Sequence, residues 1–175
     1  MSRALLYSLV GALFLLLQSS VFPLLLAPQW RPDLVLILIL VIGVKEKSVP
    51  SLVAALLLGA SQDSLGGTTS GLHIIIYLLL LILTRMLAEK LNVDSPPLFL
   101  LMVPAATLVQ TLLFGFFLAN FTDAGGLFLL LAGVLPGQLV SNLLATVILL
   151  GLFARLKPAR IYRAEGDAPF GLRGY

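Results

Sequence analysis

Long apolar runs, separated by short polar breaks and by prolines and glycines, follow one another along the chain as far as residue 153. A bilayer has a hydrocarbon core about 30 Å thick, which about 20 helical residues can cross, and lipid cannot hydrogen-bond an exposed backbone. We therefore expect each run to form a membrane-spanning helix. The expected helices occupy residues 4–27, 34–44, 48–65, 73–88, 97–119 and 127–153.

Prolines, glycines and charged residues set the limits of these helices. The first run ends at Pro23 and Pro28 and outlasts the apolar part of a secretory signal, so we expect an uncleaved helix. The second run is short and would span only if Trp30 and the lysines after it were anchored at the interfaces. The last run is too long for one perpendicular helix, and residues 133–137 (GVLPG) predict a break, with the helix proper starting at about Pro136.

Composition excludes a water-soluble monomer. Of the 175 residues, 59% are hydrophobic and 11% are charged, whereas soluble domains usually carry about 25% charged residues. We expect residues 1–154 to form one six-span transmembrane domain and residues 155–175 to form a basic cytoplasmic tail. The sequence contains no cysteine, which excludes disulfides, thiolate metal sites and cysteine nucleophiles.

The distribution of lysine and arginine predicts the orientation of the chain. With six spans and a cytoplasmic N-terminus, ten of the 11 cations fall on the inner side and Arg31 alone falls outside, as the positive-inside rule requires. We therefore expect an all-α integral membrane protein, a compact bundle of six transmembrane helices with both termini cytoplasmic. The cations are dispersed and lack interleaved aromatics, so the net charge of +3 does not indicate nucleic-acid binding. The inner cations are Arg3, Lys45, Lys47, Arg85, Lys90, Arg155, Lys157, Arg160, Arg163 and Arg173.

Polar residues on the expected outer side are the first candidate site. Asp33 follows Pro32 and suits the N-terminus of a helix, where a carboxylate faces the positive end of the dipole. Asp63 ends an apolar helix, where an ionised group needs a partner, and we expect that partner to be Gln62, His73, Thr68 or Thr69. The residues do not match a catalytic dyad or a metal set, so we expect no catalytic, metal or cofactor site.

The turn between the third and fourth helices is rich in glycine. Gly66, Gly67 and Gly71 predict a tight reversal, because glycine reaches left-handed backbone conformations without a Cβ clash. Ser70 and His73 do not predict a serine hydrolase, since they lie three residues apart at a turn without an oxyanion motif.

Small residues at four-residue spacing mark the last helix as a packing surface. Such a stripe lets helices approach closely in lipid, and flanking amides can hydrogen-bond across the interface. The stripe packs either inside the domain or against a partner. Its members are Gly133, Gly137, Ser141 and Ala145, flanked by Gln138 and Asn142; the expected complements are Thr107, Gln110 and Thr111, with Gln18 and Ser19.

Two segments carry a resemblance to a known family. The sequence PDLVLI at residues 32–37, followed by GASQDSLG at 59–66 and TSGLH at 69–73, resembles the rod-shape-determining protein MreD family. Chain length and the six-span layout agree with it. The resemblance implies a non-enzymatic subunit of the bacterial inner membrane that binds MreC. With MreC it would support the glycosyltransferase and transpeptidase of peptidoglycan synthesis that follow MreB filaments; it would contact membrane lipids, and a homo-oligomer is possible.

A second class of function stays open. Substrate-binding subunits of energy-coupling-factor vitamin transporters are similar small six-span proteins whose first helix carries a small-residue face, and Ala4, Ser8 and Ala12 keep that spacing here. Such a subunit also needs an outward pocket rich in aromatics, whereas this chain has one Trp and four Tyr, two of them in the tail. We therefore favour the scaffold.

Overall fold

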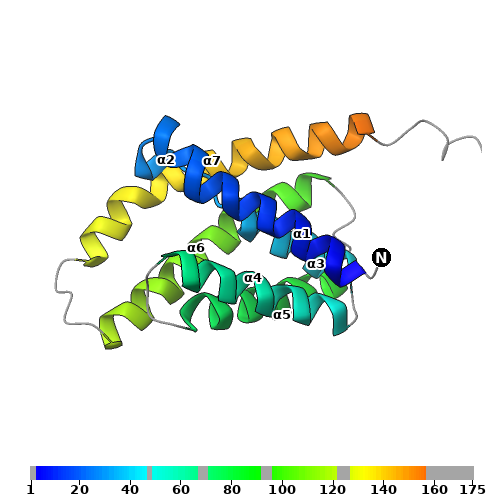
Figure 1. Cartoon of the computed structure of the whole chain (residues 1–175), viewed down its shortest axis with the longest axis horizontal. Helices are drawn as coiled ribbons and strands as arrows, with labels where there is room; N and C mark the ends of the chain where they lie inside the picture. The colour runs from blue at the N-terminus through cyan, green and yellow to red at the C-terminus, as the bar shows by residue number, and fades with distance from the viewer. Residues whose placement is uncertain (1–2, 47–48, 67–70, 92–95, 122–126, 157–175) are drawn as a thin grey trace, which may run out of the picture.

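The computed structural model describes residues 3–46, 49–66, 71–91, 96–121 and 127–156, and the regular elements within these ranges are all helical (Figure 1). The first helical segment consists of α1 (Arg3–Leu16), a π-helical turn (Leu17–Val21) and α2 (Phe22–Leu25), and a 3-10 turn, η2 (Pro28–Trp30), follows it. The other helices are α3 (Leu34–Lys45), α4 (Val49–Gly66), α5 (Leu72–Leu91), α6 (Pro96–Phe121) and α7 (Leu127–Leu156).

Helices form at each of the six expected places, and four of them are long and apolar enough to cross a membrane. These four stretches are Leu5–Leu25, Leu72–Lys90, Pro97–Asn120 and Leu130–Leu152. The apolar stretch of α4, Val49–Leu65, is shorter, and α3 has 12 residues, a length of about 18 Å at 1.5 Å per residue. That α3 and α4 cross the membrane stays a prediction.

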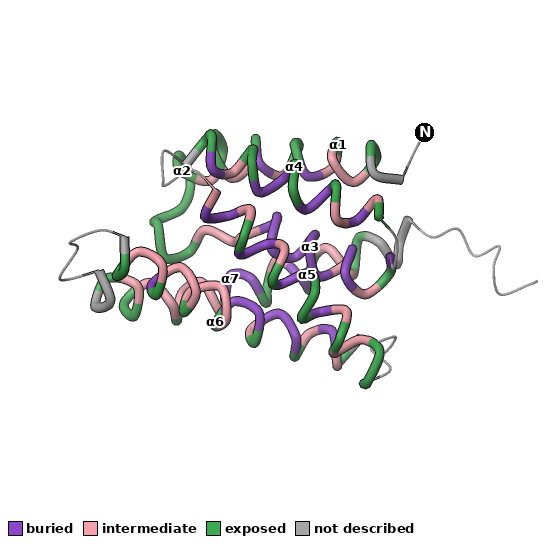
Figure 2. Tube along the Cα trace, turned by 90° about the horizontal axis from the view of Figure 1, so that it is seen from below, coloured by how far each residue is buried: buried purple, intermediate pink, exposed green. Residues whose placement is uncertain are grey.

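The short helix α3 lies at the centre of the molecule. Nine of its 12 residues are buried, and it packs against α1, α4, α5, α6 and α7. Figure 2 shows it as the most continuously buried part of the chain. A helix that is apolar on all sides needs such an environment. Protein rather than lipid therefore surrounds α3, so its stability does not require the interfacial anchoring that its shortness suggested.

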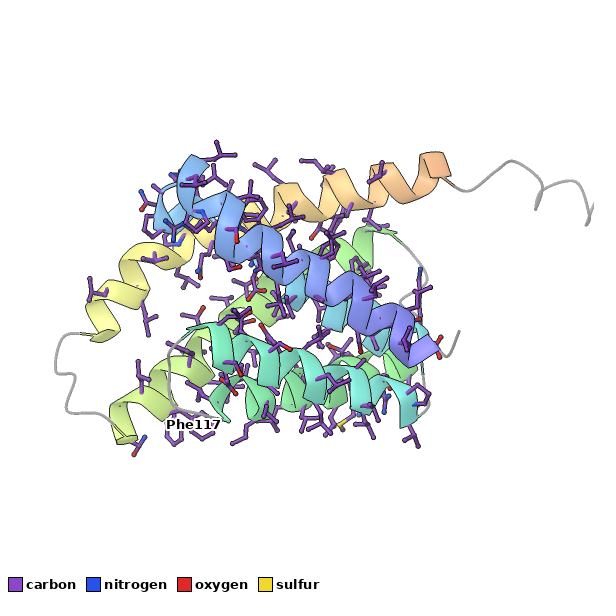
Figure 3. The ribbon with its side chains drawn as sticks, viewed as in Figure 1. Phe117 is labelled. Atoms are coloured by element: carbon purple, nitrogen blue, oxygen red, sulfur yellow. The ribbon has the colours of Figure 1, made fainter. Side chains whose placement is uncertain are left out.

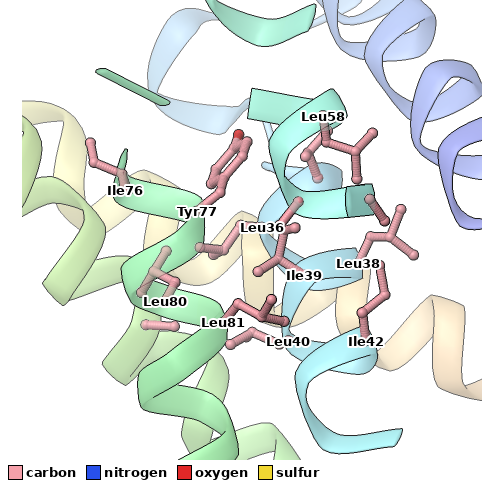
Figure 4. Packing of buried hydrophobic residues seen from close by; sticks show 14 of the residues in the cluster. Leu36, Leu38, Ile39, Leu40, Ile42, Leu58, Ile76, Tyr77, Leu80 and Leu81 are labelled. Atoms are coloured by element: carbon pink, nitrogen blue, oxygen red, sulfur yellow. The ribbon is translucent and has the colours of Figure 1, made fainter. Parts of the chain in front are cut away.

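The core forms where α3 meets α4 and α5. Leu36 and Ile39 of α3 pack with Tyr77 and Leu81 of α5 and with Leu58 of α4 (Figure 4). Most side chains that point outward are hydrocarbon (Figure 3), and their exposed fractions reach 85% at Leu24. An apolar exterior around an ordered core is the arrangement that lipid requires.

The expected break in the last helix is wrong. α7 is one continuous helix of 30 residues, and Pro136 lies inside it. Proline removes one backbone hydrogen bond and kinks a helix without having to end it, and α7 changes direction near its middle (Figure 1). α6 likewise contains Pro104 within its 26 residues. Apolar residues on both sides of each proline favour helix in lipid, where unpaired backbone groups are costly.

The two ends of the bundle differ in what they carry. The start of α1 and the end of α7 lie at one end of the molecule, while α2, the end of α6 and the start of α7 lie at the other (Figure 1). We call these the terminal end and the opposite end. The basic residues Lys45 and Lys90 lie in the last turns of α3 and α5, at the terminal end. The predicted tail from residue 157 onward lies outside the described residues.

Candidate functional site

Asp63 and His73 form a buried pair at the opposite end of the bundle. Asp63 Oδ1 lies 2.8 Å from His73 Nδ1 and accepts the backbone N–H of His73 at 2.9 Å. Asp63 Oδ2 accepts the backbone N–H of Gly71 at 2.9 Å. The carboxylate of α4 therefore caps the first turn of α5, where unpaired donors and the helix dipole favour a negative charge. Asp63 was expected to pair with one of four polar residues, and the contact identifies His73 among them.

Two glycines allow this cap to form. Gly71 has a φ of 95°, a left-handed conformation that residues with a Cβ rarely adopt. Gly59, one turn before Asp63, lies so close to α5 that an added Cβ would come within 2.6 Å of the Ile74 Cα atom. The glycine-rich reversal is confirmed at Gly71. Gly67, Thr68, Thr69 and Ser70 lie outside the described residues.

The His73 ring connects this pair to α6. Its centroid lies 5.9 Å from that of Tyr77 and 5.7 Å from that of Phe114. The imidazole thus lies between the acidic cap and two aromatic rings, and it links α4, α5 and α6. Gln62, the neighbouring candidate, is half-buried on α4.

Asp33 lies at the centre of a second network. Its Oδ1 accepts the backbone N–H of Leu36 at 2.9 Å, which caps α3, and also accepts Gln18 Nε2 at 3.2 Å. Its Oδ2 accepts Gln110 Nε2 at 2.7 Å. The Asp33 backbone N–H donates to Asn142 Oδ1 at 2.6 Å. One residue therefore joins the π-helical turn, α3, α6 and α7.

Asn142 extends the Asp33 network along α7. Its Nδ2 donates to Thr107 Oγ1 of α6 at 3.0 Å, and the residue is 1% exposed. The expected contact between the last helix and Thr107 is therefore confirmed. Gln18 and Gln110 were expected to complement the amides of that helix, and this expectation is wrong, because the charged carboxylate of Asp33 takes both of their N–H groups. Charge-assisted hydrogen bonds are stronger than bonds between two amides.

The small-residue stripe of α7 divides into an inner and an outer part. At Gly137 an added Cβ would lie 2.5 Å from the backbone oxygen of Gln29 in η2, and Ser141 is buried. At Gly133 an added Cβ would meet no described atom within 4 Å. Gln138 is half-buried, and its backbone oxygen accepts the hydroxyl of Ser141 at 3.1 Å. The stripe therefore packs internally at Gly137 and Ser141, whereas Gly133 is exposed.

A third polar group, at the terminal end, was not expected from the sequence. Tyr7 donates its hydroxyl to Glu46 Oε1 at 3.1 Å, and Arg85 donates to the Glu46 backbone oxygen at 3.2 Å and to the Ser51 hydroxyl. These residues join α1, α3, α4 and α5. The available signal was Arg85 itself, a charge near the end of an apolar helix that needs partners in or beside the membrane. Its described partners cannot be read from spacing, since they lie on α4 and at the end of α3.

The chemistry of these groups is that of hydrogen bonding between helices. Asp33 and Asp63 belong to separate networks, each held by its own N–H donors. Two carboxyl groups that act together in acid–base catalysis lie close to each other and have pKa values that are shifted apart. Within the described ranges, no group of three or more His, Cys, Asp or Glu residues is placed to hold a metal ion.

Comparisons with known proteins give one match. A protein-family model described as rod shape-determining protein MreD matches residues 2–156, which include every described helix. Neither the curated proteins nor the solved structures gave a match to this chain.

Proposed function

This chain belongs to the MreD family of rod shape-determining proteins, and from that premise we propose that it is a non-enzymatic, multi-pass scaffold subunit of the bacterial cell-elongation machinery. Its place is the inner, cytoplasmic membrane. The observation that carries this proposal is the family match over residues 2–156. Cell shape is the role in the family's own description, and the four span-length helices agree with a membrane protein.

The hydrogen-bond networks support a structural role. The Asp33 network joins four helical segments, and the pair of Asp63 and His73 joins α4 to α5. Bonds of this kind stabilise helix contacts in a membrane, where the hydrophobic effect does not act between helices. The polar side chains thus fix the relative positions of the helices, as a scaffold requires, and the apolar exterior stays available to lipid and to partner helices.

We propose MreC as the direct partner. Through it the chain would support the glycosyltransferase and transpeptidase of peptidoglycan synthesis and follow MreB filaments on the cytoplasmic side. Both termini would be cytoplasmic, which places the basic tail beside anionic lipid headgroups, where each cation contributes about 1 kcal/mol. A second copy of the chain is a further candidate partner.

Purification from native membranes with their lipids retained tests this proposal. The chain, tagged and extracted in polymer-bounded lipid discs from a rod-shaped bacterium, should recover MreC and peptidoglycan synthases above the level recovered by an unrelated tagged six-span protein. Recovery of coupling ATPase subunits instead would favour the vitamin-transporter alternative, which the family match does not support. Recovery of neither set would contradict the scaffold.

A further inference from the structure

The hydroxyl of Tyr77 lies deep inside the protein without a hydrogen-bond partner among the described residues. Tyr77 is 0% exposed, and the side-chain oxygens of Gln18 and Gln110 are likewise buried without a described partner. Leaving a buried donor or acceptor unpaired is destabilising, and most such groups are bonded to protein or to ordered water. Three such atoms in one region of a protein point to something that satisfies them together.

Two of the three atoms belong to amides that bind Asp33. Gln18 and Gln110 both donate their Nε2 groups to the Asp33 carboxylate. This fixes the orientation of each amide, because its oxygen must point away from the negative charge. Both amide oxygens are buried without a described donor, so they are free to accept.

Tyr77 reaches the same region from α5. His73 of α5 faces Phe114 of α6 with ring centroids 5.7 Å apart. The two helices run in opposite directions. Tyr77, one turn after His73 on α5, is therefore level with Gln110, one turn before Phe114 on α6. In Figure 4 its hydroxyl points away from Leu80 and Leu81 and past Leu36, which lies near the start of α3.

We propose that these side chains hold a buried water molecule. A water there would donate its two hydrogens to the Gln18 and Gln110 oxygens and accept the hydroxyl hydrogen of Tyr77. That gives three hydrogen bonds, the usual number for a buried water. A metal cation would suit the two amide oxygens but would leave the Tyr77 donor unpaired, which favours water.

This water site would tie α5 into the Asp33 network. The described hydrogen bonds of Asp33 and Asn142 join the π-helical turn, α3, α6 and α7, while those of Asp63 join α4 and α5. A water shared by Tyr77, Gln18 and Gln110 would connect these two sets of helices through hydrogen bonds.

The sign of a stability change tests the site. Tyr77→Phe removes the hydroxyl and keeps the ring, so the fold is retained. If the hydroxyl binds water, the apparent Tm in detergent should fall by about 2–4 °C. If nothing binds it, deleting an unpaired buried group should raise the Tm and overturn the proposal. Tyr7→Phe is the matched control, because the Tyr7 hydroxyl has a direct partner in Glu46.

A second measurement asks whether the occupant is shared and whether it is water. In a Gln110→Leu background the effect of Tyr77→Phe should shrink, because the same water has already lost one acceptor. An unchanged effect would contradict a shared site.

A change of salt distinguishes water from a cation. Replacing choline chloride by sodium chloride at equal ionic strength should leave the Tm unchanged. A sodium-dependent rise in Tm that Tyr77→Phe abolishes would identify a bound cation and overturn the proposal of a water molecule.

Discussion

Asp33 and Asp63 show how a carboxylate is kept inside an apolar protein. Asp33 caps α3 with one oxygen and accepts the Gln110 amide with the other, whereas both oxygens of Asp63 accept backbone N–H groups at the start of α5. Ionised groups are expensive within a membrane and persist there when they are paired. Around each carboxylate, N–H donors from other helical segments take the place of water. Removing the carboxylate should therefore weaken the packing between those segments.

Replacing Asp63 by alanine should reduce the amount of folded protein. The substitution removes the cap from α5 and leaves the backbone N–H groups of Gly71 and His73 without their acceptor. The loss of a cap and of buried hydrogen bonds costs about 1–3 kcal/mol. Fluorescence-detected size-exclusion chromatography should therefore show a smaller monodisperse peak and a lower apparent Tm than in the parent protein.

Gln62→Ala is the control for Asp63→Ala, because Gln62 is the half-buried neighbour on the same helix. It should leave the peak height close to that of the parent. A normal peak for Asp63→Ala, combined with loss of co-purifying partners, would contradict the structural role and assign Asp63 to a direct contact with a partner.

At the scale of the element, α7 combines an internal contact with an exposed face. Gly137→Leu should lower folded yield, because an added Cβ already lies 2.5 Å from the Gln29 backbone oxygen, and overpacking of this kind costs about 1–3 kcal/mol. Gly133→Leu is the matched control one turn away, where an added Cβ meets no described atom within 4 Å. It should leave yield unchanged. Yield and thermal stability of the purified proteins measure both effects.

The outcome of this pair also locates the partner surface. Loss of MreC from the Gly133→Leu protein at normal yield would place a partner on the exposed part of the stripe. Normal yield for Gly137→Leu would contradict the internal packing of η2 against α7.

Helix positions could be predicted from the sequence, whereas only some of the polar contacts between helices could be. Apolar runs and their proline and glycine limits located every long helix, because lipid leaves the backbone few alternatives. The predicted break at Pro136 is wrong because proline weakens a helix only locally, and the apolar residues on both sides of it remain helical. The pairing of Asp63 with His73 could be expected because a short turn joins their helices. Gln110 and Asp33 lie 77 positions apart, so only the three-dimensional packing brings them together.

At the scale of the whole molecule, the basic residues are distributed unequally between the two ends of the bundle. Lys45 and Lys90 mark the terminal end, whereas Arg31 lies between η2 and α3 at the opposite end. A cytoplasmic terminal end would satisfy the positive-inside rule. This orientation depends on the crossing of α3, since each crossing reverses the side on which the following segments lie.

Accessibility on either side of α3 tests the orientation of the whole molecule. The chain has no cysteine, so single substitutions can be labelled without background in the full-length protein. Ala27→Cys should react with a membrane-impermeant maleimide added to intact spheroplasts, in which the outer face of the inner membrane is accessible. Ser48→Cys should react only after the spheroplasts are permeabilised. Reporter fusions after Arg31 and Lys47 should likewise report opposite sides.

The length of α3 does not prevent it from crossing. Its 12 residues span about 18 Å, which is less than the thickness of the bilayer core. Because neighbouring helices bury α3, it can cross inside the protein, where lipid does not contact it. If both cysteines react from the same side, α3 does not cross, and the ten-to-one distribution of cations must have another cause.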